Sequence, residues 1–89
     1  MSSNRINISP DLLIPPGETI SDVLAERNIT RAELAARTGV SLAYVDSIIA
    51  GERDISSEFA VALEDVLGVP KSFWMNLQRN FEREKAELE

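Results

Sequence analysis

TRAELAARTGVSLAYVDSIIAG, residues 30–51, is the stretch that decides the fold. Thr30 and Glu33 have the T-x-x-E spacing of a capping box, in which each side chain binds a backbone N–H group left free at the start of a helix. An apolar stripe follows, and Gly39 stands where the chain must leave that helix, a position that often needs a positive φ. The pattern predicts a short helix over about residues 31–38.

A second helix is predicted over about residues 42–50. Ser41 can cap its start, and Gly51 stands at its end. Three apolar residues at helical spacing form its expected inner face: Val45, Ile48 and Ile49. Two capped helices joined by a glycine turn are typical of a helix-turn-helix that reads DNA.

The length and amino-acid composition of the chain argue against enzymes and metal-binding proteins. The 89 residues suit one small domain, and the absence of cysteine and histidine leaves only carboxylates for metal binding or acid–base catalysis. We therefore expect a protein that is not an enzyme and has no metal or cofactor. No apolar run approaches the length of a membrane span, and the N-terminus lacks the apolar core of a signal peptide, so a cytoplasmic location is expected.

The net charge of −6 is unusual for a DNA-binding domain, which generally carries a basic surface. Residues 17–68 hold only four arginines against ten acidic residues. This balance predicts modest affinity for DNA that depends strongly on salt.

Three further helices complete an all-α fold. Pro16 and Glu18 suit the first turn of a helix that runs to about Arg27. Ser56 can cap another helix, and the last one starts near Lys71. The residues expected to be buried in the first and fourth helices are Ile20, Val23, Leu24, Ala60, Leu63, Val66 and Leu67. We divide the chain into a flexible arm (1–13), a helix-turn-helix domain (14–82) and a charged helix end (83–89).

With its flanks, the chain resembles the HigA-type antitoxins of the lambda-repressor-like (XRE) helix-turn-helix superfamily. The resemblance covers about residues 14–82. It rests on Pro16-Gly17-Glu18, Glu33-Leu34-Ala35, Gly39-Val40-Ser41, Arg53-Asp54-Ile55-Ser56 and Phe73-Trp74-Met75-Asn76-Leu77-Gln78. The last block is the most specific of these.

The resemblance implies a five-helix lambda-repressor-like domain and a role in a toxin–antitoxin pair. Similar sequences bind a ribosome-dependent RNase toxin of the RelE type and, usually as homodimers, repress their shared operator. The third helix would then lie in the major groove of operator DNA.

The expected DNA-binding residues lie at the start of the second helix, along the third helix and just beyond it. They are Arg31, Ser41, Leu42, Ala43, Tyr44, Ser47 and Arg53. Arg31 and Arg53 are the candidates for phosphate contacts, although Arg53 could instead pair with Glu52 or Asp54. Tyr44 could bind a phosphate or be an ordinary exposed tyrosine.

Two of these residues depart from the family pattern. Relatives commonly carry polar or basic side chains where this chain has Leu42 and Ala43, which cannot make the hydrogen bonds that discriminate between bases. At most, the two residues could contact thymine methyl groups. The alternative hypothesis is a protein-binding module that has kept the fold but reads DNA with little specificity.

The last helix carries a group of large apolar residues, for which we expect a homodimer interface. The group consists of Phe73, Trp74, Leu77 and Phe81. Aromatic residues are enriched at interfaces, and a chain of this length has little core left for a final helix to cover. Either Phe73 or Trp74 is expected to be partly inserted into the bundle. Phe59 is expected at the periphery of the core, with a partner contact as the alternative.

Overall fold

The computed structural model describes residues 13–88, so the expected N-terminal arm, apart from Leu13, lies outside the described part of the chain. Within that part the structure consists of five helices without strands, as predicted. They are α1 (Pro16–Arg27), α2 (Arg31–Thr38), α3 (Leu42–Ile49), α4 (Ser57–Leu67) and α5 (Lys71–Leu88). The charged segment after residue 82 continues α5 as far as Leu88.

The predicted helix caps are present. The Thr30 hydroxyl accepts a hydrogen bond from the Glu33 N–H (3.0 Å), and the Glu33 carboxylate accepts one from the Thr30 N–H (2.8 Å). This backbone hydrogen bond lowers the pKa of Glu33 below its ordinary value. The Ser41 and Ser56 hydroxyls cap α3 and α4 by accepting hydrogen bonds from the Tyr44 and Phe59 N–H groups, and Gly39 ends α2 with φ of 79°.

Every helix contributes side chains to one hydrophobic core. Its fully buried members include Ile20, Leu34, Val45, Ile48, Ala60, Leu63, Leu67 and Trp74. Three residues expected to be buried, Val23, Ile49 and Val66, are only partly buried and pack against its edge. Each lies at the border of its helix's apolar stripe, where one side of the side chain still meets solvent. Phe59 is buried in the core rather than exposed to a partner.

Gly17 explains why the first helix can approach α3 so closely. A Cβ atom at this position would clash with the carbonyl oxygen of Ile48 and with Cα of Ile49, and would lie 2.8 Å from the Ile49 carbonyl oxygen. The N-terminal turn of α1 therefore packs directly on the backbone at the end of α3. Only glycine leaves room for this crossing.

Helix α5 faces the core with Trp74 and Gln78, one turn apart. The Trp74 indole N–H donates to the Val69 carbonyl (3.2 Å). Gln78 accepts a hydrogen bond from the Ile55 N–H (2.9 Å) and donates to Glu82 (3.1 Å), so α5 holds the loop between α3 and α4. Trp74 is fully buried within one chain and is removed from the expected dimer interface. It is the aromatic residue inserted into the bundle, because its side chain is a fully buried member of the hydrophobic core.

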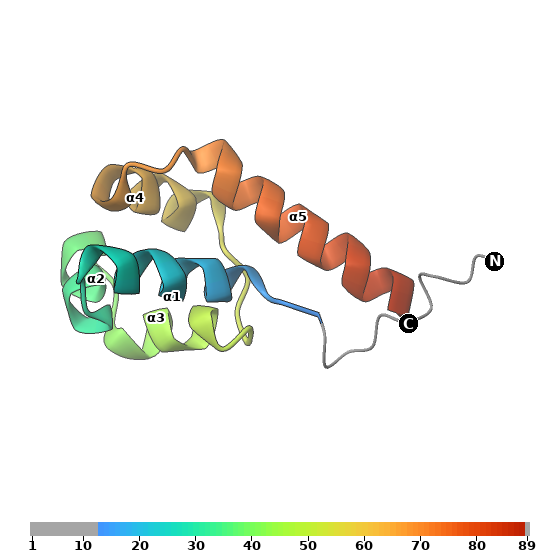
Figure 1. Cartoon of the computed structure of the whole chain (residues 1–89), viewed down its shortest axis with the longest axis horizontal. Coiled ribbons are helices and arrows are strands. Elements are labelled where there is room, and N and C mark those ends of the chain that lie inside the picture. The colour runs from blue at the N-terminus through green and yellow to red at the C-terminus, as the bar shows by residue number, and fades with distance from the viewer. Residues whose placement is uncertain (1–12, 89) are drawn as a thin grey trace.

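Helices α2 and α3 lie at one side of the molecule, whereas the far half of α5 extends beyond the other four helices (Figure 1). Helix α3 packs against α1 and α2, and α5 packs against α4 and α1. This arrangement separates the helix-turn-helix unit from the exposed end of α5. Over residues 13–88, no helix has the length and hydropathy needed to cross a membrane.

Candidate nucleic-acid interface

Helix α3 packs on the hydrophobic core with one side and exposes the opposite side to solvent. Val45 and Ile48 are each only 1% exposed and fix the helix to the core. On the opposite side Leu42 is 45% exposed and Ala43 is also exposed. Among the described residues, no helix covers this outer side, which therefore has the geometry that a recognition helix requires.

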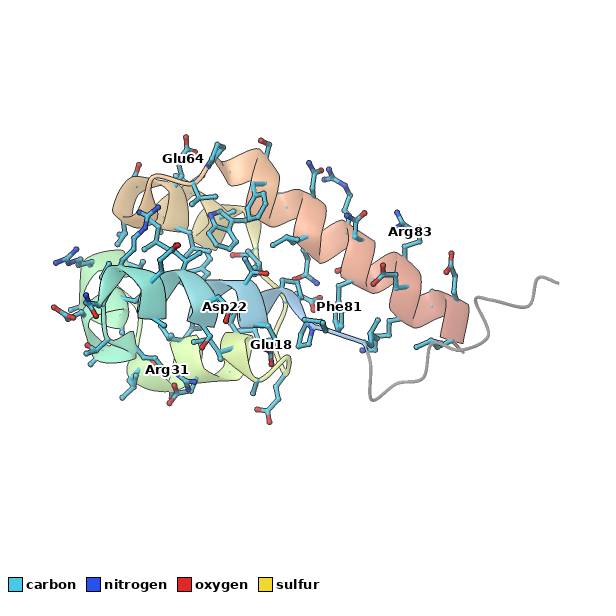
Figure 2. The ribbon with its side chains drawn as sticks, in the orientation of Figure 1. Glu18, Asp22, Arg31, Glu64, Phe81 and Arg83 are labelled. Atoms are coloured by element: carbon cyan, nitrogen blue, oxygen red, sulfur yellow. The ribbon has the colours of Figure 1, made fainter. Side chains whose placement is uncertain are left out.

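Arg31, at the start of α2, forms an ion pair with a residue on this outer side. Its guanidinium Nη1 donates to Oδ1 of Asp46 at 3.1 Å, and both side chains are about half exposed (49% and 48%). It is the one ion pair found over residues 13–88. An exposed ion pair contributes little to stability. What the pair does is hold the Arg31 guanidinium against Asp46 of α3. Figure 2 shows Arg31 at the edge where α2 meets α3, on the side away from α5.

Arg53 is held against the other end of α3. Its Nε donates to the Ser47 hydroxyl at 3.1 Å, and its guanidinium lies 4.7 Å from the centre of the Tyr44 ring. The suggested pairs of Arg53 with Glu52 or Asp54 are not formed. Stacking on Tyr44 and the hydrogen bond to Ser47 keep the cation beside α3.

Ser47 and Tyr44 have less freedom than expected for residues that read bases. The Ser47 hydroxyl donates its proton to the Tyr44 carbonyl (2.7 Å) while it accepts from Arg53. The Tyr44 ring is partly buried and meets Phe59 edge-on, with the ring centres 5.4 Å apart. Tyr44 is therefore neither fully exposed nor aimed freely outward. Ser41 is occupied in capping α3.

The seven predicted DNA-binding residues thus gather around α3. Leu42 and Ala43 lie on its outer side, Arg31 reaches it from α2 and Arg53 reaches it from the following loop. Both arginines are engaged with side chains of α3. Acidic side chains also lie on other parts of the surface, including Glu18 and Asp22 on α1 (Figure 2).

Comparison with known proteins identifies the family to which this chain belongs. The helix-turn-helix family matches residues 20–74. The antitoxin HigA of Pseudomonas aeruginosa, solved with the higBA promoter, is 36% identical to this chain, with a TM-score of 0.78 and coverage of 83% of this chain and 82% of that chain. The chain belongs to the HigA-type helix-turn-helix family. It is a member of a family of regulators and antitoxins, which confirms that it is not an enzyme.

One further relative carries the HigA family name, and another is an HTH-type regulator. An addiction module antidote protein of the HigA family from Coxiella burnetii is 27% identical, has a TM-score of 0.76 and covers 83% of this chain and 82% of that chain. The uncharacterised HTH-type transcriptional regulator YddM of Escherichia coli K12 is 28% identical over 72 residues, which are 81% of this chain and 77% of that protein.

Sequence analysis missed one residue on the exposed side of α3 in this HigA-type protein. Asp46 is not among the residues that the sequence predicts to bind DNA, yet it is the partner of Arg31. Its position one turn after Leu42 places it on the same exposed side. That spacing could have identified it, whereas the identity of its partner depends on how α2 and α3 cross.

Proposed function

We propose that this HigA-type protein binds operator DNA by placing α3 in the major groove and thereby represses its own promoter. The observation that carries the proposal is the outer side of α3, left open and flanked by Arg31 and Arg53. The relative solved with its promoter, which shares 36% identity, supports a DNA-binding role for this chain.

The test is a titration of the protein with duplex DNA from its own promoter and with a shuffled duplex of the same composition. Specific binding that weakens steeply with salt is expected, because contacts to phosphates release counterions. Arg31→Ala lowers the affinity, and the slope of log K against log salt falls by about 0.9 for each lost phosphate contact.

Arg83→Ala is the matched control, since it removes the same charge from the far part of α5 (Figure 2). This variant should bind like the wild type. Equal effects of the two substitutions would mean that only net charge matters, and binding of both duplexes with equal affinity would contradict the proposal.

The proposed second role is neutralisation of a basic RNase toxin of the RelE type from a cytoplasmic toxin–antitoxin pair. The family resemblance and the net charge of −6 support it, because an acidic protein attracts a partner that binds RNA. The product of the adjacent gene should co-elute with this protein, and its ribosome-dependent mRNA cleavage should stop. A neighbouring product that neither binds nor cleaves mRNA would contradict this role.

The alternative function is a protein-binding module without specific DNA recognition. It is favoured by the engagement of Arg31 and Arg53 with side chains of α3, and by the apolar character of Leu42 and Ala43. Tight capture of a protein partner, with no preference for promoter DNA over the shuffled duplex, would support this alternative.

A further inference from the structure

The exposed side of α3 offers very few groups that could form hydrogen bonds with DNA bases. Leu42 and Ala43 are apolar, and the Ser47 hydroxyl proton is already donated to the Tyr44 carbonyl. The phenol of Tyr44 belongs to a ring packed between Arg53 and Phe59. Asp46 is the remaining polar side chain on this face of the helix, and it is half exposed.

The Asp46 carboxylate keeps binding capacity beyond its ion pair. Arg31 contacts Oδ1, which leaves Oδ2 for another donor. A carboxylate can only accept hydrogen bonds, and the major-groove partner that suits it is the N4 amino group of cytosine. The neighbouring Leu42 side chain, 45% exposed, suits a thymine methyl group.

Arg31 gives this carboxylate a fixed position. A guanidinium group has five N–H donors, so Arg31 can hold Asp46 through Nη1 and still reach a phosphate oxygen with the others. The pair also offsets the repulsion that an isolated carboxylate would experience beside the phosphate backbone.

We propose that Asp46 is a specificity-determining residue of this protein and selects cytosine at one position of each half-site, with Arg31 as the positioning residue for its carboxylate. This inference rests on the proposed DNA-binding function. Under this proposal, recognition of the DNA sequence depends on the carboxylate of Asp46, in a chain that is itself acidic.

The test exchanges the carboxylate for an amide. Asn recognises adenine rather than cytosine, because it both donates to N7 and accepts from N6. In duplexes that carry each base pair in turn at every operator position, wild-type binding should fall about fivefold or more when one cytosine is replaced. Asp46→Asn should shift the preference at that position to adenine and leave the other positions unchanged.

Glu52→Gln is the matched control for charge, because it removes one exposed negative charge just beyond α3. It should strengthen binding to every duplex by a similar factor and keep the preference for cytosine. Thermal melts of both variants confirm that the fold is intact, as expected for substitutions of exposed carboxylates.

Two results would overturn the inference in distinguishable ways. If the wild type prefers its promoter but Asp46→Asn only strengthens binding uniformly, as Glu52→Gln does, Asp46 does not read a base and the proposed function stands. If the wild type shows no preference for promoter DNA over the shuffled duplex, the proposed function fails and the inference fails with it.

The role of Arg31 has its own readout. Arg31→Ala should weaken binding to all duplexes and, in addition, reduce the preference for cytosine at the Asp46 position, and Arg31→Lys should restore part of both. A preference for cytosine that is unchanged in Arg31→Ala would remove Arg31 as a positioning residue.

Discussion

At the scale of single residues, Phe73 and Trp74 are chain neighbours in contrasting environments. The Phe73 side chain is 41% exposed, whereas Trp74 is fully buried and its indole N–H is bound to the Val69 carbonyl. The two rings meet edge-on with their centres 5.2 Å apart. One aromatic residue therefore stabilises the monomer, while the other remains accessible to a second chain.

Trp74→Ala should lower the free energy of unfolding by about 3–5 kcal/mol, because it leaves a large cavity in the hydrophobic core. Phe73→Ala, on the same helix, should cost much less in the monomer. Urea denaturation at low protein concentration measures both. Similar losses for the two variants would contradict the assignment of Trp74 to the core.

The lowered pKa of Glu33 predicts how its contribution to stability depends on pH. The folded state favours the charged form through the Thr30 N–H, so Glu33 stabilises the fold above its ordinary pKa, and this contribution is lost as the pH falls through the lowered value. The difference in unfolding free energy between the wild type and Glu33→Gln should therefore shrink from about pH 7 to about pH 3. A difference that does not change with pH would contradict this prediction.

At the scale of helices, much of the structure could be predicted because its signals are local. The capping box of Thr30 and Glu33, the Ser56 cap and the glycine at position 39 fix helix boundaries within a few residues of the chain. Local signals also have limits. Nothing in the sequence around Gly17 reveals that the end of α3 packs on it, because that contact joins residues about 30 positions apart.

Gly17→Ala should disturb the crossing of α1 and α3. The added methyl group would overlap the backbone at Ile48 and Ile49, and overpacking of this kind typically costs about 1–3 kcal/mol or more. Glu18→Ala, at the neighbouring exposed position, is the control. A thermal melt of Gly17→Ala that matches the wild type would show that α1 does not approach α3 as closely as described.

At the scale of the whole molecule, the contacts that assemble the candidate site join residues far apart in the chain. Arg31 with Asp46, Arg53 with Ser47 and Gln78 with the Ile55 backbone all depend on how the helices pack. The sequence predicted that both arginines lie beside α3 but not which side chains they contact, because several acceptors were equally possible before the packing was known.

An apolar stripe on α5, exposed at Phe73 and partly buried at Leu77 and Phe81, leads us to predict a homodimer. Phe73, Leu77 and Phe81 recur one turn apart, and the last two line a groove of about 240 Å³ together with Ile14. Light scattering should give about twice the monomer mass of 9.8 kDa. Phe81→Glu should give a monomer, because it places a charge in the apolar interface, whereas Arg83→Glu should remain dimeric. A monomeric wild type at micromolar concentration would contradict the prediction.

The most direct test of the central claim, that the outer side of α3 contacts DNA, is an NMR titration of the protein with its promoter duplex. We predict that the backbone amide shifts concentrate in α3, at the start of α2 and around Arg53, and that a shuffled duplex produces smaller shifts there. Shifts confined to α4 and α5, or identical responses to the two duplexes, would contradict the account.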